Sequence, residues 1–272
     1  MALPIHTDSS ISSMRYLPTN EAYDRWAAVY DTDGNFLQVL DTTELKTLFP
    51  QFLHSITSSK PWRIVDLGCG TGRSTALLLA VPGIEEVVAL DSSKGMLEVA
   101  RSRLQQASEG ARSSNIEPVQ VVPRLRLEVF DMLASPSPPT SAQQADGVIS
   151  TLVVEHVPLA TFFSQVSQVL RPGGMLLLTN MHAHMGGISQ AGFVDADTGE
   201  KIRPMSYAHT VSGIVTEAKN WGLVAESAGE GNEPRIRERV VLEDMVEKLG
   251  PRSAKWVGVT CWFGGLFRKT ES

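Results

Sequence analysis

The stretch Ile64–Arg73, IVDLGCGTGR, carries the strongest structural signal in the sequence. A hydrophobic run ends there in a glycine-rich turn, which is typical of a buried strand whose backbone approaches a ligand closely. The glycines are spaced G-x-G-x-G, and Arg73 stands where a dinucleotide-binding fingerprint would have its third glycine. No Gly-Lys-Ser/Thr follows, which argues against a phosphate-binding P-loop. The turn therefore indicates a ligand site without naming the ligand.

Segments with the patterns of strands and helices alternate outward from this turn. The expected strands are 62–67, 85–91, 124–131, 146–154 and 173–181, and the helices between them are 75–80, 92–107 and 159–170. Such alternation predicts an α/β fold of the Rossmann-like, doubly wound type. Ligands of such a fold bind at the carboxyl ends of the parallel strands.

The first 60 residues are predicted to be an N-terminal arm and a helical lid. Residues 1–18 are rich in Ser, Thr and Pro without apolar periodicity, so we expect a mobile arm. A helix is predicted over 19–31, because four apolar residues recur on one face: Tyr23, Trp26, Ala27 and Tyr30. A second helix is expected near Asp41, since Asp41–Glu44 resembles a capping box, and Pro50 should kink or divide it.

Residues 61–272 are predicted to form the main domain, with a hairpin inserted near 184–208. The segment 192–204 has apolar or long side chains around an Asp-Thr-Gly turn, which indicates a β-hairpin beside the site. A helix is expected over 209–221, and a closing strand over 255–269.

The composition excludes several classes of partner. The net charge of −6 argues against binding to nucleic acid or to an anionic membrane surface, since both need clustered Lys and Arg. No apolar stretch reaches the roughly 18 residues of a membrane span, and the N-terminus lacks the pattern of a signal peptide. Two cysteines, Cys69 and Cys261, are too few for a zinc site. We therefore expect a cytoplasmic protein without a metal.

Acidic residues at the ends of expected strands point to the kind of ligand. Asp91 ends the strand after the glycines, where a carboxylate can accept both hydroxyls of a ribose. That position suits NAD equally well. Asp131 ends the following strand, where it can accept the amine of an adenine while Phe130 or Met132 packs on the purine. Asp66, just before the glycines, adds negative potential that favours a cationic ligand.

Five motifs in the sequence occur in a fixed order: DLGCGTG, ALDSSKGML, VFDM, DGVISTLVVEHV and VLRPGGMLLLT. Together they resemble the motif series of class I S-adenosylmethionine-dependent methyltransferases. The resemblance covers roughly residues 62–182. It implies a seven-stranded sheet with a C-terminal antiparallel strand, S-adenosylmethionine as cofactor and S-adenosylhomocysteine as product. It also implies the cofactor contacts: Gly68, Cys69 and Gly70 beneath the methionine moiety, Asp91 on the ribose, Ser92 and Met96 beside the adenosine, Asp131 and Met132 on the adenine, and Leu152 and Val153 on the reactive side. Asp66 is expected to belong to the same cofactor site through its negative potential.

The N-terminal helix adds a second resemblance. Its sequence AYDRWAAVYD is similar to the helix that caps the cofactor pocket in many small-molecule methyltransferases. The similarity implies that Tyr23 or Tyr30 reaches the cofactor and that Trp26 contacts the acceptor. The longer run up to Asp41 also resembles fungal natural-product methyltransferases, such as the gliotoxin-pathway amide N-methyltransferase.

Histidines near the strand ends are candidates for a general base, because an amine or hydroxyl acceptor must lose a proton. His156 follows the fourth expected strand, and His182 follows the fifth. We expect His156 or His182 to be catalytic. His182, Tyr207 and His209, which flank the insertion, are expected to contact the acceptor. A structural hydrogen bond is the alternative role for each of these histidines.

The acceptor is predicted to be a small molecule, with N-methylation favoured over O-methylation. The segment after the fourth strand has no Asn-Pro-Pro-Tyr-like tetrad, which would resemble methyltransferases of nucleobase or glutamine nitrogens. It also lacks the paired-glutamate loop of protein arginine methyltransferases. We expect a monomer or a homodimer.

Two other functions fit part of the sequence. An NAD-dependent oxidoreductase would explain the glycines and Asp91, but not Asp131 or the Arg171–Gly174 motif, RPGG. A catalytically silent methyltransferase-like partner protein would keep the fold without turnover. The intact glycines and acidic residues favour an active enzyme.

Overall fold

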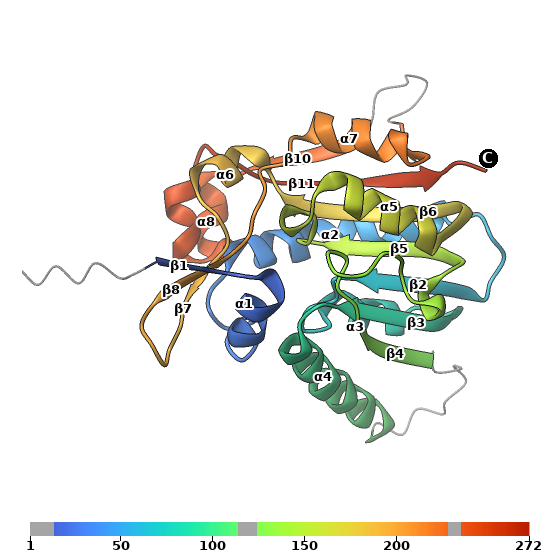
Figure 1. Cartoon of the computed structure of the whole chain (residues 1–272), viewed down its shortest axis with the longest axis horizontal. Helices are drawn as coiled ribbons and strands as arrows, with labels where there is room; N and C mark the ends of the chain where they lie inside the picture. The colour runs from blue at the N-terminus through green and yellow to red at the C-terminus, as the bar shows by residue number, and fades with distance from the viewer. Residues whose placement is uncertain (1–13, 114–123, 228–234, 272) are drawn as a thin grey trace, which may run out of the picture.

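A central β-sheet organises the molecule, and the computed structural model describes residues 14–113, 124–227 and 235–271 of the chain (Figure 1). The strand order is β10-β11-β6-β5-β2-β3-β4, and β9 also pairs with β11. The bounds are β2 Trp62–Leu67, β3 Ile84–Asp91, β4 Arg124–Val129, β5 Ala145–Thr151, β6 Leu170–Met181, β9 Leu223–Ala225, β10 Ile236–Val240 and β11 Thr260–Lys269. Strands β2 to β6 run parallel, and β11 is antiparallel to β6.

This arrangement confirms the Rossmann-like α/β fold, with one difference in the sheet. The sheet has eight strands in the described residues, whereas seven were expected. Two short strands share the outer edge of β11: β10 pairs with its first half and β9 with its last three residues. The five residues of β10 are half-buried or exposed and mostly polar, so the sequence gives them no apolar strand pattern.

Helices cover both faces of the sheet because neighbouring strand residues point to opposite sides. Ile64 packs into one core with Phe52 of helix α2 (Phe36–Ser55) and Leu78 of helix α3 (Arg73–Leu79). Val65 packs into the other core, to which helices α5 (Leu159–Val169) and α7 (Val211–Asn220) contribute side chains. Helix α4 (Lys94–Ser113) follows β3, and its Leu97 packs in a separate small cluster with Ala89 of β3. The short helices are α6 (Ala183–Ile188) and α8 (Val246–Leu249).

Helix α2 begins earlier than its sequence pattern indicated. Asn35 caps it by accepting a hydrogen bond from the Leu37 backbone nitrogen at 3.1 Å. Asp41 and Glu44 therefore lie inside the helix, and the predicted capping box at Asp41 is wrong. The element continues through Pro50 to Ser55 as one helix. It packs against β6 and β11 in the main core, so it belongs to the sheet domain and not to a lid.

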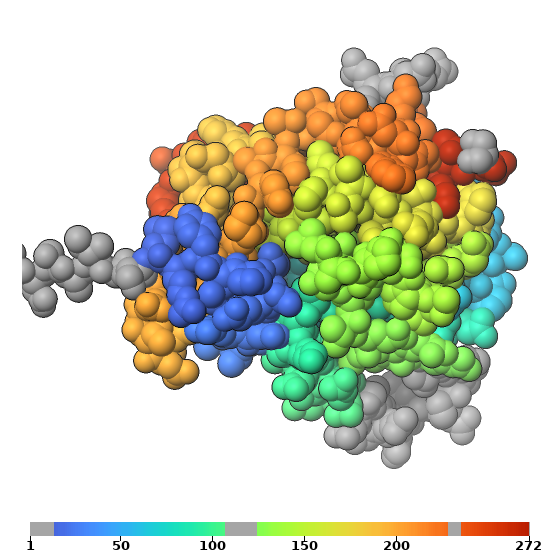
Figure 2. Space-filling model, viewed as in Figure 1, coloured from blue at the N-terminus to red at the C-terminus, as the bar shows by residue number. Residues whose placement is uncertain are grey.

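The true cover of the sheet edge is a small second sheet. Strand β1 (Met14–Leu17) pairs in parallel with β8 (Lys201–Pro204), which forms a hairpin with β7 (Phe193–Val194). The predicted hairpin is thereby observed, whereas the expectation of a mobile arm is wrong for residues 14–17; residues 1–13 lie outside the described part. Figure 2 shows the N-terminal residues, in blue, lying beside this hairpin.

Helix α1 (Thr19–Trp26) packs beneath the small sheet. It is shorter than the expected helix over 19–31, and residues 27–31 form turns. The indole of Trp26 stacks on the ring of Phe193, with centroids 5.1 Å apart. Among the described helices, none is long and apolar enough to cross a membrane.

Candidate functional site

A cavity of about 740 Å³ lies where the carboxyl ends of the parallel strands meet the N-terminal cover. Its walls come from β1, α1, the glycine turn after β2, and the segments that follow β3, β4 and β5. The cavity brings together most of the predicted site residues: Tyr23, Tyr30, Gly68, Gly70, Asp91, Ser92, Met96, Asp131, Met132, Leu152, Val153, His156 and Tyr207. Its size and position are those expected for a cofactor and its acceptor.

The glycine turn is fixed by backbone hydrogen bonds and by close packing. The amides of Gly68 and Cys69 both donate to the carbonyl of Leu90, at 2.8 and 2.9 Å. A Cβ at Gly68 would lie 2.3 Å from Cγ2 of Val153, so only glycine fits there. Gly70 differs: its φ is +53°, and a Cβ would meet no protein atom within 4 Å. That open space borders the cavity and suits a ligand lying against bare backbone.

Asp91 links the turn to the next strand. Its Oδ2 accepts from the Gly70 amide at 2.8 Å, and its Oδ1 accepts from the Ser93 amide at 2.8 Å. Burial raises the pKa of this carboxyl, and the two backbone hydrogen bonds oppose that rise. Each carboxylate oxygen has a further lone pair, so Asp91 can still accept two hydroxyls of a ribose.

Asp131 lies at the far end of the cavity, after β4. Its Oδ1 accepts from the Leu133 amide at 2.8 Å, which leaves the other oxygen available to an amine donor. Phe130 and Met132 line the cavity on either side of it in sequence. The arrangement forms an apolar slot with one acceptor, which is what an adenine requires. Three features together fit S-adenosylmethionine: the open backbone at Gly70, the two oxygens of Asp91 that can accept ribose hydroxyls, and this apolar slot.

Five predicted residues do not line this cavity. Cys69 is buried, and burial raises the pKa of its thiol well above the usual range. Asp66 is also buried and accepts from the Thr75 hydroxyl at 2.6 Å. Trp26 lines a neighbouring cavity instead.

The other two are histidines with structural contacts. His182 caps α6 by accepting from the His184 amide, and its Nε2 lies 3.5 Å from Glu238. Neither described cavity at this end of the sheet includes it. The ring of His209 stacks on Tyr207, and its Nε2 lies 2.9 Å from the Val157 carbonyl.

His156 and Tyr23 form a hydrogen-bonded pair on the wall of the cavity. His156 Nδ1 lies 2.7 Å from the carbonyl of Met205, and its Nε2 lies 2.8 Å from the Tyr23 hydroxyl. Since a carbonyl only accepts, Nδ1 carries the proton and Nε2 accepts from Tyr23 in the neutral ring. Burial raises the pKa of Tyr23 well above its usual range, so the phenol stays protonated. Its oxygen therefore keeps lone pairs for a proton from the acceptor.

Backbone strain occurs next to these residues. Leu152 has a φ of +58°, which a branched side chain rarely adopts. The residue lies directly after β5 and lines both the large cavity and a smaller one beside it. The strained residue thus belongs to the wall that the two cavities share.

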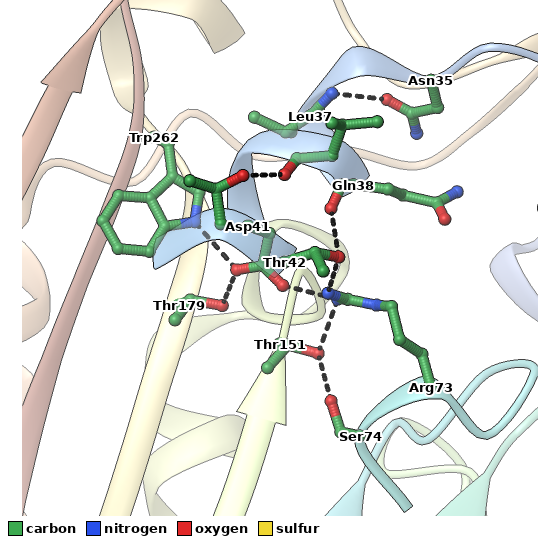
Figure 3. Close-up of polar contacts among 12 residues, drawn as sticks. Asn35, Leu37, Gln38, Asp41, Thr42, Arg73, Ser74, Thr151, Thr179 and Trp262 are labelled. Atoms are coloured by element: carbon green, nitrogen blue, oxygen red, sulfur yellow. Dashed lines mark hydrogen bonds and ion pairs between the residues drawn. The ribbon is translucent and has the colours of Figure 1, made fainter. Parts of the chain in front are cut away.

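Sequence reasoning missed a buried polar network that supports the glycine turn (Figure 3). Arg73, which replaces the third glycine of the dinucleotide pattern, donates to Asp41 and to the Thr151 hydroxyl. Asp41 also accepts from Trp262 at 2.8 Å and from Thr179 at 2.6 Å. The network joins α2, α3, β5, β6 and β11. Arg73 therefore points into the protein and not into the cavity.

Glu155 was also not among the predicted residues. It lies in the short 3₁₀ turn Val154–His156, and only 4% of its surface is exposed. Its Oε1 is 3.4 Å from His156 Nε2. Its place next to His156 in the sequence is the one signal that could have pointed to it.

Comparisons with known proteins agree on one kind of domain. Residues 65–178 match the family described as Methyltransferase domain. An uncharacterized methyltransferase of Emericella nidulans is 47% identical over 92% of this chain and 91% of its own. A trans-aconitate 2-methyltransferase of Rhizobium leguminosarum is 30% identical over 74% of this chain and 84% of its own. The solved structure of a DhpI–S-adenosylhomocysteine complex has the same fold, with a TM-score of 0.57 and 16% identity over 93% of this chain and 96% of that one.

Proposed function

Because the chain belongs to the class I S-adenosylmethionine-dependent methyltransferases, we propose that it methylates a small-molecule acceptor, on nitrogen in preference to oxygen. The observation that carries the proposal is the covered cavity. Strand β1 and helix α1 close the edge of the sheet, and Tyr16, Leu17 and Tyr23 line the cavity from that side. A cavity enclosed in this way suits a metabolite, whereas a protein or nucleic-acid acceptor needs an open surface. By its resemblance to fungal enzymes, we propose a secondary metabolite.

The cofactor contacts follow from the geometry of the cavity. Gly70 offers bare backbone, Asp91 offers two acceptors, and Asp131 offers one acceptor beside the apolar Phe130 and Met132. When bound, the cofactor supplies a methyl group whose bond to sulfur breaks, leaving the electron pair on sulfur, as the acceptor nitrogen forms the new N–C bond. The chain must therefore exclude water and take up the proton that the nitrogen releases.

Tyr23 and His156 are placed to take up that proton. The hydroxyl oxygen of Tyr23 accepts it, and the tyrosine passes its own proton to His156 Nε2 at 2.8 Å. Glu155 lies 3.4 Å from the same nitrogen and stabilises the imidazolium that results. The Met205 carbonyl holds the ring in the tautomer that this transfer requires.

O-methylation of an organic acid is the second candidate function. The relative that is 30% identical is named for trans-aconitate, which is a carboxylic acid. A carboxylate carries no proton at neutral pH, so this reaction would not need the Tyr23–His156 pair. The two candidates therefore differ in their dependence on Tyr23.

The test uses S-adenosylmethionine with a labelled methyl group and an extract divided into metabolites and macromolecules. We expect label in the metabolites, in a product that resists alkaline hydrolysis, as an N-methyl group does and a methyl ester does not. Label in the macromolecules would overturn the small-molecule acceptor, and an alkali-labile product would favour the acid. Absence of label from both fractions would favour the silent partner protein. Comparing metabolites of cells with and without the gene would then identify the acceptor.

Variants at two tyrosines separate catalysis from folding. Tyr23→Phe should lower turnover about 10²-fold, while the affinity for S-adenosylhomocysteine changes far less. Tyr16→Phe is the matched control, because its hydroxyl donates only to the half-buried Gln190 side chain among the hydrogen bonds described. Equal turnover of the two variants would remove Tyr23 from the proton path.

A further inference from the structure

A second, smaller cavity of about 100 Å³ adjoins the cofactor cavity. Tyr23, Tyr30 and Leu152 line both, so the two spaces share a wall. The small cavity also touches α2, the segment before β7 and the 3₁₀ helix Pro251–Trp256. Its position between the N-terminal cover and the strand ends is where an acceptor would extend beyond the cofactor.

One buried carboxylate in this cavity has an oxygen without a hydrogen-bond donor among the described residues. Glu155 lines the cavity with 4% of its surface exposed, and its Oε2 accepts no hydrogen bond from any residue that the structure describes. Its other oxygen lies 3.4 Å from His156 Nε2, which already accepts from Tyr23. A buried carboxylate without a hydrogen-bond donor destabilises the folded chain, so a cationic donor bound in the cavity would stabilise it.

The remaining walls of the cavity suit a cation. Five aromatic residues line the same cavity as Glu155, namely Tyr23, Trp26, Tyr30, Phe36 and Trp256. The face of an aromatic ring attracts a cation, and it does so more strongly when the cation is desolvated. The rings of Tyr23, Trp26 and Tyr30 are also packed against one another, with centroids 5.1 to 5.8 Å apart, which holds them in place without a ligand.

Two basic residues on the same cavity have partners of their own. Arg252 donates to the Asp33 carbonyl and lies 3.9 Å from its carboxylate. Lys255 is exposed, and its Nζ lies 5.3 Å from the ring centroid of Trp256. Neither forms an ion pair with Glu155 in the described structure. The Oε2 atom of Glu155 is therefore available to a hydrogen-bond donor of a bound ligand.

We propose that this cavity binds a protonated amino group of the acceptor, which donates to Glu155 Oε2 between the aromatic rings. The assignment rests on the proposed function, because it names the chemical class of the acceptor: an aliphatic amine. An ammonium nitrogen has no lone pair, so before methyl transfer it gives one proton to the Tyr23 oxygen, and Tyr23 passes its own proton to His156 Nε2. A single buried carboxylate offers too few oxygen ligands for a metal ion, and its charge repels an anion.

The test compares three small probes of similar shape: isobutylammonium, the neutral isobutanol and the anionic isobutyrate. Binding is followed by protein-observed NMR in the presence of saturating S-adenosylhomocysteine. We expect isobutylammonium to bind at least about tenfold more tightly than isobutanol, and isobutyrate to bind least. The shifts should be concentrated at Glu155, Tyr30 and Trp256.

Glu155→Gln keeps the shape of the side chain and removes its charge. In this variant the preference for the ammonium over the alcohol should fall to within about twofold, with S-adenosylhomocysteine affinity unchanged. Glu98→Gln, on the exposed face of α4, is the matched control and should keep the full preference.

Two results would overturn the proposal while leaving methyl transfer intact. One is equal binding of isobutylammonium and isobutanol to the unaltered chain. The other is tighter binding of isobutyrate, which would assign the cavity to Arg252 and Lys255 and to an acidic acceptor. A chain that does not bind S-adenosylhomocysteine would instead contradict the proposed function itself.

Discussion

At the scale of single residues, two glycines allow the cofactor site to be tested against backbone strain. Gly70 and Gly199 have positive φ values of +53° and +68°, and a Cβ at either meets nothing within 4 Å. Only Gly70 borders the cavity. Changing either residue to Ala should cost about 1 kcal/mol of unfolding free energy.

The two variants should differ in ligand binding. Gly70→Ala should weaken S-adenosylhomocysteine more than about tenfold by calorimetry, because the methyl group occupies ligand space, while Gly199→Ala should bind normally. Equal affinities in both variants would place the ligand elsewhere.

Asp66 predicts a dependence of stability on pH. Burial raises the pKa of this carboxyl to about 7, against about 3.8 in the unfolded chain, with the Thr75 hydrogen bond opposing the rise. The folded protein thus holds the proton more tightly, so this contribution to stability is full below about pH 4 and declines as the pH rises to about 7. The shift corresponds to at most about 4 kcal/mol.

The Asp66→Asn variant removes this titration. The difference in unfolding free energy between the variant and the unaltered chain, measured in urea, should therefore shift in favour of the variant as the pH rises from about 4 to about 7. Above that range the difference should be constant. Asn can still accept from Thr75, so the folded structure is kept. A difference that is independent of pH would mean that Asp66 does not change protonation in this range.

The cofactor side of the candidate site could be predicted from the positions of residues at the ends of strands. Asp91 and Asp131 follow strand ends, and parallel strands bring their carboxyl ends to one edge, so their convergence follows from topology. The contact of Tyr23 with His156 spans 133 residues and depends on how the cover docks, which no local pattern encodes. Glu155 was missed for a related reason, since its importance comes from the lack of a partner in the folded chain.

At the scale of elements, the carboxylate of Asp24 joins helix α1 to the start of helix α4. Asp24 accepts from the Ser93 hydroxyl at 2.6 Å and from the Gly95 amide at 2.9 Å, at the start of α4. Asp24→Ala should speed amide hydrogen exchange in α1 up to about 30-fold, because two hydrogen bonds worth about 1 kcal/mol each are lost. Turnover should fall as the cover opens more often.

Glu21→Ala is the matched control on the same helix. Its side chain pairs only with Arg25, one turn along α1, among the contacts described. Exchange in α1 should change little in that variant. Equal effects of the two substitutions would show that the contact with α4 does not hold the helix.

Local patterns predicted the elements of the sheet well and those of the cover poorly. The buried strands have continuous apolar runs, so β2, β3, β5 and β6 were expected close to their observed places. The start of α2 was missed because Asp41, which looks like a helix cap, is instead buried by Trp262 and Thr179. Strand β1 has three exposed residues of four, and its pairing with β8 crosses most of the chain, so it has no apolar signal.

At the scale of the whole molecule, the cover of the cavity is assembled from distant segments. Strand β1 and helix α1 come from the N-terminus, and the β7–β8 hairpin comes from the insertion after β6. They share one small sheet and one apolar cluster around Trp26, Phe193 and Ile202. Segments joined in this way should open and close as one unit.

Hydrogen exchange tests this coupling. S-adenosylhomocysteine should slow exchange in residues 14–31 and 193–204 together, because closure of one requires the other. Phe193→Ala removes the ring that stacks on Trp26, so exchange should speed up in α1 although the substitution lies in the hairpin. Val194→Ala, at a side chain that is 62% exposed, should leave α1 unchanged.

Deletion of residues 1–31 extends the test to function. The deletion removes β1, α1 and the Tyr23 hydroxyl that bonds to His156. The main sheet keeps both of its hydrophobic cores, so the truncated chain should fold. It should nevertheless lose most of its turnover. Retained turnover on a small acceptor would mean that the N-terminal segments form a docking face and not a lid. Slowed exchange confined to residues 62–132 would lead to the same conclusion, because the cofactor would then be held by the glycine turn and its neighbouring strand ends without closure.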